Sequence, residues 1–242
     1  MQNILYFFGH GFCHQIPARS FETGGLYFAV CARDTGIHMG VALALLVAFL
    51  LSTRSKRKPG DIPPVRVLVL LGLLVVPMAF DGLSSYLGFR ETTNLIRYFT
   101  GLCTGIAVGT LIAPLLLALR RDSDRTVKAF NTPVTAALQL LSSFALGTLF
   151  FFALPLLEGL SSYVAPLIAL TALFVFVGSI NLLVLSISRR FAPAGSGKRW
   201  AILIGLTLVF LLAEVVLMGA IHHLLLSVFT DGRTLTQLFF ER

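Results

Sequence analysis

The sequence contains little charge and few cysteines. Only 12 % of its 242 residues are Asp, Glu, Lys or Arg, whereas 56 % are hydrophobic and the mean hydropathy is +0.87. A soluble domain cannot bury that much apolar surface, so this composition excludes a soluble globular protein and predicts that lipid surrounds most of the chain. Three cysteines are too few for a disulfide framework.

Recognised catalytic signatures are absent as well. HExxH and GxSxG do not occur, and GSGK at 195–198 has neither the preceding strand nor the spacing of a phosphate-binding loop. The net charge of +8 comes from short basic clusters between apolar runs. Clusters of this kind are typical of membrane topology signals, so we expect no nucleic-acid partner.

Long hydrophobic runs are what the sequence has in abundance. Runs of about 20 residues match a hydrocarbon core about 30 Å thick. Six spans are predicted, at Gly36–Thr53, Val65–Leu83, Leu95–Leu119, Pro133–Leu157, Val164–Ile187 and Ala201–Val228. We therefore expect an all-α polytopic transmembrane helix bundle. The glycine-rich stretch GLCTGIAVGT (101–110) predicts close helix packing within it.

The basic residues predict how the bundle is oriented. Thirteen of the 19 Lys and Arg residues lie in the segments after the first, third and fifth spans, counting Arg66, and six lie elsewhere. Because positive loops stay in the cytoplasm, we expect both termini outside a prokaryotic cytoplasmic membrane, with the membrane lipids as partners. The chain then divides into an outer N-terminal Cys/His segment (1–35), three spans with an outer polar loop (36–119) and three further spans (120–242).

The first twelve residues, MQNILYFFGHGF, lack the features of a cleavable signal peptide. We expect them to lie along the outer interface, with a re-entrant segment or a short seventh span as the alternative.

Two stretches of the sequence are similar. PMAFDGLSSYLGF (77–89) and PLLEGLSSYVAP (155–166) share an acidic residue followed by GLSSY. Duplication would make spans two–three and four–five a parallel repeat of the kind found in transporters, with Asp81 and Glu158 equivalent. A chance match between apolar sequences is the alternative.

Reactive side chains gather in CHQIPARSF (13–21) and CARDTGIH (31–38). Thiolate, imidazole and carboxylate groups at such spacing suit zinc, which is the cofactor that the residues favour. The candidate metal ligands are Cys13, His14, Cys31, Asp34 and His38, the last lying one helical turn beyond Asp34. The alternatives are a Cys13–Cys31 disulfide and simple buried thiols.

Several arginines are expected at the same outer face. Guanidinium groups bind phosphate or carboxylate through two parallel hydrogen bonds and stay charged when partly buried. The candidate substrate-binding residues are Arg19, Arg33, Arg90, Asn94 and Arg97, and they would suit an anionic lipid headgroup or a polyprenyl phosphate. The alternative is internal pairing with Glu22, Asp34, Asp81 and Glu91.

Glu214 lies near the middle of the sixth span, where an ionised carboxylate costs at least about 2.5 kcal/mol. A carboxylate at that depth suggests a proton, cation or metal site. The alternative is a protonated glutamate hydrogen-bonded to a neighbouring helix, and Gln139 and Asn181 are expected to face inward. Together with the outer polar residues, this gives His14, Asp81 and Glu214 as candidate catalytic residues.

The pattern CHQxPxRSF, then CAR-x-TGI-x-x-G, then DG with G-x-R-x-x-x-N-x-x-R-x-x-TG resembles the DUF2085 family of predicted prokaryotic membrane proteins. In this chain the pattern runs from Cys13 to Gly101, roughly within the first half. Members of that family commonly have cysteine where this chain has Asp34 and tyrosine where it has His38. The resemblance implies a membrane protein with a polar site and specifies no reaction.

Three functions compete on this sequence. The first is a membrane-embedded enzyme acting on an anionic or lipid-linked substrate, in which Asp81, His14 or a metal-bound water does acid–base or hydrolytic work. The second is a transporter or channel that uses Glu214 and the carboxylates near the outer face. The third is an accessory subunit whose N-terminal segment docks a partner.

Overall fold

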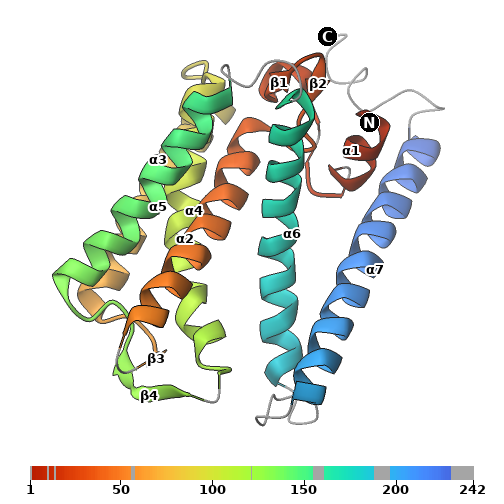
Figure 1. Cartoon of the computed structure of the whole chain (residues 1–242). Coiled ribbons are helices and arrows are strands. Elements are labelled where there is room, and N and C mark those ends of the chain that lie inside the picture. The colour runs from red at the N-terminus through yellow and green to blue at the C-terminus, as the bar shows by residue number, and fades with distance from the viewer. Residues whose placement is uncertain are drawn as a thin grey trace.

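The structure is a computed structural model that describes residues 2–9, 11–13, 15–55, 58–120, 122–154, 161–187 and 197–229. Its helices are α1 (Gln2–Gly9), α2 (Ala32–Arg54), α3 (Val65–Tyr86), α4 (Asn94–Leu117), α5 (Pro133–Ala153), α6 (Ser161–Ile187) and α7 (Gly197–Phe229). The short elements are a 3₁₀ turn (Pro17–Arg19) and the strands β1 (Glu22–Thr23), β2 (Leu26–Tyr27), β3 (Lys58–Asp61) and β4 (Ser123–Lys128). Figure 1 shows α1 and the β1–β2 hairpin at one end of the bundle and β3–β4 at the other.

Helices α2 to α7 are each long and apolar enough to cross a membrane. They confirm the predicted all-α bundle and its six spans. Helix α2 begins at Ala32, four residues before the expected start at Gly36, and α7 begins at Gly197 rather than Ala201. The charged pair Arg33–Asp34 fits inside α2 because a carboxylate from α3 neutralises Arg33.

Helices α2 and α4 form the centre of the bundle. Within their spans 56 % and 61 % of the residues are buried, against 22 % in α3, α5 and α7. Glycines let the two backbones touch, because a Cβ on Gly101 would lie 2.2 Å from the carbonyl oxygen of Arg33, and one on Gly105 would lie 2.1 Å from that of Ile37. The glycine-rich stretch of α4 therefore packs as predicted.

Helix α1 lies at one end of the bundle, between the ends of α6 and α7 (Figure 1). Leu5 is fully buried against Leu170 and Leu173 of α6, and the Phe8 ring meets that of Phe174 edge to face. Eight residues span only about 12 Å, so this helix is too short to cross a membrane. Its location along the outer interface stays a prediction, and the structure adds that its apolar side chains pack against α6.

The segment between α1 and α2 closes one end of the bundle. Gln15, in the left-handed region at φ 52°, donates its side-chain amide to the carbonyls of Tyr6 and Ala29, both at 2.9 Å. The ring of Phe21 meets those of Phe28 and Tyr98 edge to face, each at 5.7 Å. Buried aromatic contacts of this kind stabilise the cap. They hold residues 15–30 against α4, α5 and α6.

At the opposite end of the bundle, β3 pairs with β4 in parallel. Lys58 forms a 2.8 Å ion pair with Asp122, and Arg66 donates to the carbonyl of Asn131. This end carries the basic segments that follow α2 and α4.

The two helix pairs of the predicted repeat, α3–α4 and α5–α6, are packed differently. Helix α3 packs against α4, whereas α5 and α6 each pack against α2. Glu158, the predicted equivalent of Asp81, lies outside the described residues.

The α2–α4 contact predicts a sharp difference between two glycines. Gly105→Ala should lower the free energy of unfolding by roughly 1–3 kcal/mol, because the new methyl group would overlap the Ile37 carbonyl. Gly72→Ala in α3 is the matched control, since a Cβ there meets nothing within 4 Å. Thermal unfolding in detergent compares the two variants, and equal melting temperatures would contradict the close contact.

Candidate functional site

A buried carboxylate joins two arginines at the end of the bundle that carries the β1–β2 hairpin. Asp81 of α3 is 1 % exposed; its Oδ2 accepts a 2.5 Å hydrogen bond from Arg33 of α2, and its Oδ1 accepts one from Arg90 in the α3–α4 loop. A buried charge is stable only when it is paired and hydrogen-bonded, and here both oxygens have a partner. The polar residues of the two sequence segments therefore meet, as the sequence predicts.

The α3 helix supplies two further contacts to Arg90 that the sequence analysis missed. The Nε of Arg90 donates to the hydroxyl of Ser84 at 3.0 Å, and its guanidinium stands 5.8 Å from the centre of the Phe80 ring. Ser84 lies three residues after Asp81, on the same face of the helix, and that spacing is the signal that could have revealed it.

Asn94 connects the second polar segment to the N-terminal cap. Its amide donates to the carbonyls of Ala18 and Ser20, both at 3.3 Å, and its Oδ1 accepts from Arg97 at 3.2 Å. The structure thus uses Asn94 to fix the first turn of α4 against residues 18–20. A role for Asn94 in binding a substrate stays a prediction.

Arg97 carries a positive charge that none of the described carboxylates pairs with. Burial disfavours its charge most, Arg19 and Arg33 repel it, and Asp81 and an ionised Cys31 attract it. Within the described ranges, no carboxylate lies within ion-pair distance of Arg97 or of the exposed Arg19. The positive charge around Arg97 therefore exceeds the negative charge that the described residues place near it. We call Arg19, Arg33, Arg90 and Arg97, with Asp81, the arginine cluster.

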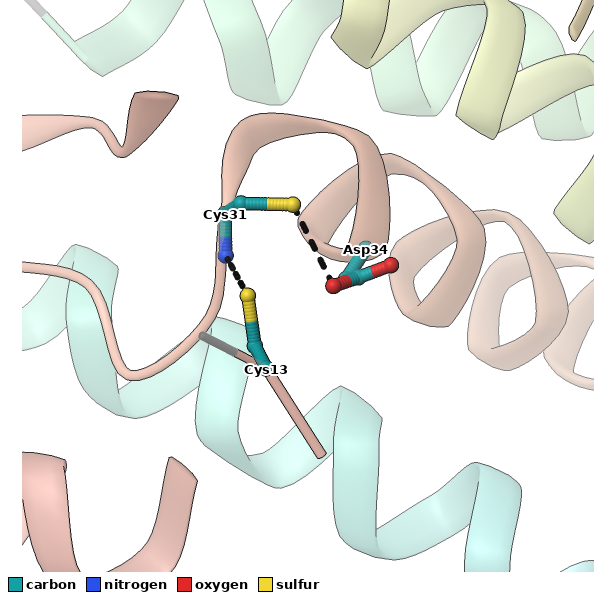
Figure 2. A group of neighbouring side chains, drawn as sticks. All are labelled: Cys13, Cys31 and Asp34. Carbon is teal, nitrogen blue, oxygen red and sulfur yellow. Dashed lines mark hydrogen bonds between the residues drawn. The ribbon is translucent and has the colours of Figure 1, made fainter. Parts of the chain in front are cut away.

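Two thiols and a carboxylate form a second group beside it, shown in Figure 2. One ligand atom from each of Cys13, Cys31 and Asp34 lies within 4.8 Å of the other two. The backbone N–H of Cys31 donates to the Cys13 sulfur, and the Cys31 thiol donates to Asp34 Oδ2, both at 3.2 Å. Cys31 is the N-cap of α2 and Asp34 lies in its first turn, so the start of this helix positions both.

The two thiols differ in acidity. Hydrogen bonding between the side chains of Cys13 and Cys31 lowers the pKa of Cys13. The same contact, together with burial and the nearby Asp34 charge, raises the pKa of Cys31. The first thiolate of the pair therefore forms at Cys13, where the Cys31 N–H stabilises it. Both sulfurs are free thiols in this structure, as is that of Cys103.

His38, a further predicted metal ligand, is not part of this group. His38 lies on α2 one turn beyond Asp34, is 7 % exposed and stacks its ring at 5.7 Å from that of Phe176. Its Nδ1 has no hydrogen-bond partner among the residues that the structure describes. His14 lies outside those residues, so its metal and catalytic roles stay predictions.

Glu214 of α7 is paired with a different helix. Its Oε2 accepts a 2.8 Å hydrogen bond from Asn181 of α6, and Asn181 is buried. Gln139 is fully buried in α5 and donates to the Ala44 carbonyl and the Thr110 hydroxyl. Both amides face inward as predicted. No described contact joins Glu214 to Asp81, and the catalytic roles of these two carboxylates stay predictions.

The six apolar helices with a polar group at one end define a multi-pass helical membrane protein. The sequence profile of the family described as "Predicted membrane protein (DUF2085)" matches residues 13–111, which contain both the arginine cluster and the Cys13–Cys31–Asp34 group.

Two archaeal proteins are similar to part of this chain, and both are described as uncharacterised proteins. A protein of Methanothermobacter thermautotrophicus is 40 % identical over 99 residues, which is 41 % of this chain and 82 % of that protein. A protein of Methanocaldococcus jannaschii is 35 % identical over 107 residues, which is 44 % of this chain and 65 % of that protein. The chain belongs to the DUF2085 family. No solved structure matches it.

The shared carboxylate predicts a large stability effect at Asp81. Asp81→Asn should lower the free energy of unfolding by roughly 2 kcal/mol, because it removes the counter-charge of Arg33 and Arg90 while those side chains keep partial access to solvent. Asp122→Asn is the control, since its carboxylate is 51 % exposed. Thermal unfolding in detergent measures both, and an Asp81→Asn protein as stable as the control would contradict the assigned pairing.

Proposed function

We propose that the arginine cluster binds the phosphate group of an anionic lipid or lipid-linked molecule. The supporting observation is Arg97, which is repelled by Arg19 and Arg33 and has no ion-pair partner among the described residues. An anion bound at this position would relieve the repulsion. Guanidinium groups are suited to this task because they remain charged and offer two parallel N–H donors to a phosphate.

Asp81 holds two arginines of the cluster in place for such a ligand. By holding Arg33 and Arg90 on its two oxygens, it fixes the direction of both guanidiniums before any ligand arrives. Side chains held in place lose less conformational entropy on binding. Asp81 acts here as a positioning residue, and its burial keeps it away from the ligand itself.

The lipid character of the ligand is argued from α3. Beside Arg90 this helix exposes Phe80, Leu83 and Tyr86 at 67 %, 62 % and 91 %. In a spanning helix such side chains contact the bilayer, and the Arg90 guanidinium already stands over the Phe80 ring. A headgroup phosphate could reach the arginines from the bilayer while its acyl chain follows the exposed face of α3.

Transport is a second candidate function, supported by a separate contact. The Glu214–Asn181 hydrogen bond joins α6 and α7 within the spans and holds an ionisable group there. We rank transport below lipid binding because, among the described residues, no second ionisable group pairs with Glu214. Catalysis on a bound lipid, which the sequence also predicts, needs a base that reaches the ligand.

We infer that the arginine cluster lies at the non-cytoplasmic face of a prokaryotic cytoplasmic membrane. The basic segments after α2 and α4 stand at the β3–β4 end (Figure 1), and the cluster stands at the opposite end, where α2 begins and α3 ends. The tendency of Lys and Arg to stay in the cytoplasm then places the cluster, and the start of the chain, outside.

Removing Arg97 should weaken lipid binding. Loss of one charge-assisted hydrogen bond costs about 1.5–3 kcal/mol, so Arg97→Ala should bind phosphatidylglycerol about 10- to 150-fold less tightly than the unchanged protein. Native mass spectrometry of detergent-solubilised protein titrated with phosphatidylglycerol measures the affinity. Phosphatidylcholine is the neutral comparison lipid.

Arg54→Ala is the matched control for this experiment, because Arg54 is an exposed arginine at the far end of α2. Equal loss of phosphatidylglycerol in the Arg54→Ala and Arg97→Ala proteins would contradict a specific site. Inorganic phosphate alone should not raise the melting temperature; a rise with phosphate and none with phosphatidylglycerol would mean that the ligand is a soluble anion.

The orientation is tested with reporter fusions. Alkaline phosphatase, which folds only outside the cytoplasm, should be active when fused after Gly88 in the α3–α4 loop and inactive when fused after Gly60 in β3. A green fluorescent protein fusion should show the reverse. Activity of the phosphatase at Gly60 would overturn the inferred orientation while leaving the arginine cluster unaffected.

A further inference from the structure

The Cys13–Cys31–Asp34 group brings three metal-ligating side chains together from two separate segments. Cys13 follows α1, whereas Cys31 and Asp34 open α2, eighteen residues further along the chain. All three ligand atoms lie within 4.8 Å of one another. We propose that these residues bind a zinc-type divalent metal ion, and that the ion fastens the N-terminal segment to α2.

The spacing of the group suits a tetrahedral ion. With Zn–S bonds of about 2.3 Å and a Zn–O bond of about 2.0 Å, two thiolates lie about 3.8 Å apart and a thiolate and a carboxylate oxygen lie about 3.5 Å apart. The Cys31 sulfur and Asp34 Oδ2 are 3.2 Å apart, and no pair exceeds 4.8 Å. The largest separation is thus at most about 1 Å longer than a tetrahedral zinc ion requires of two thiolates.

The chemistry of the donors selects the kind of ion. Thiolates favour zinc and other soft or borderline metals over magnesium and calcium, and a carboxylate can take a further corner of the tetrahedron. The N-terminus of α2 and the Cys31 N–H both stabilise negative charge on these ligands. Ion binding would replace the proton that the Cys31 thiol shares with Asp34.

His38 adds an independent observation. It lies one turn beyond Asp34 on the same face of α2, within electrostatic range of that carboxylate, and its buried Nδ1 has no partner among the described residues. A buried imidazole without a hydrogen bond is costly. His38 is not among the three residues whose ligand atoms lie within 4.8 Å of one another, so the fourth position of a tetrahedral ion is left to water or a ligand, with the unpartnered His38 nitrogen one helical turn further along α2.

The metal site does not depend on the proposed phosphate binding, although the two groups adjoin. Arg97 lies within electrostatic range of Cys31, so a phosphate held by the arginine cluster would stand beside the ion. Loss of metal with lipid binding intact would leave the proposed function standing. Loss of lipid binding with metal intact would leave the present inference standing.

Elemental analysis gives the first test. The full-length protein, purified from membranes with reductant and without chelator, should contain about one zinc per chain by inductively coupled plasma mass spectrometry. After removal of the metal, titration with Co²⁺ should produce thiolate-to-cobalt charge-transfer absorption and the d–d bands of a tetrahedral ion. Because the ion joins two segments of the folded chain, metal removal should also lower the melting temperature.

Cysteine variants locate the ion. Cys13→Ser and Cys31→Ser should lose the bound zinc and the cobalt charge-transfer band, whereas Cys103→Ser should keep both because Cys103 lies within α4. Asp34→Asn keeps the shape of the side chain and should weaken Co²⁺ binding at least about tenfold. It also serves as the second variant should a cysteine substitution prevent folding, which circular dichroism reports.

Two results would overturn the inference. One is a Cys13–Cys31 disulfide in protein that is isolated from membranes without bound metal, detected by mass spectrometry after alkylation without reduction. The other is zinc content that does not change in the Cys13→Ser and Asp34→Asn proteins, or that falls equally in Cys103→Ser.

Discussion

The arrangement of the polar end depends on one carboxylate shared by two guanidiniums. Asp81 is buried, so its charge is tolerated only because Arg33 and Arg90 occupy both of its oxygens. These contacts join α2, α3 and the α3–α4 loop at one point. They also fix the first turn of α2, and with it Cys31 and Asp34, which lie on either side of Arg33 in the sequence. Two residues of the arginine cluster, Arg33 and Arg90, and two of the Cys13–Cys31–Asp34 group are therefore positioned by the same interaction.

Backbone contact between α2 and α4 provides the second constraint. Gly101 rests on the carbonyl of Arg33, and Arg97 lies one turn earlier on α4. A side chain at position 101 would push the helices apart and move Arg97 away from Arg33. The small residues that bring two spanning helices together thus also hold two positive charges close to each other. This unrelieved repulsion is the feature that an anionic ligand would use.

Much of the fold could be predicted from the sequence, because span length and hydropathy are local properties of the chain. The six spans and the glycine contact were predictable in this way. The start of α2 was not, because Arg33 enters a spanning helix only when Asp81 neutralises it, and that pairing depends on which faces of α2 and α3 meet. The packing of α1 was missed for a similar reason, since its partners Leu170 and Leu173 are distant in the sequence. The polar residues, and their division into candidate metal ligands and candidate anion-binding arginines, could be listed from the sequence, but the pairing of Asp81 with both Arg33 and Arg90 could not.

The region matched by the family, residues 13–111, contains the shared carboxylate, both arginines that pair with it and the glycine contact. The direct test of this account is a double-mutant cycle between Arg33 and Asp81, with Arg33→Gln and Asp81→Asn alone and together, followed by unfolding in detergent. Because Asp81 is buried and pairs directly with Arg33, we expect a coupling free energy of about 1–3 kcal/mol. Effects of the two substitutions that add to within about 0.5 kcal/mol would contradict it.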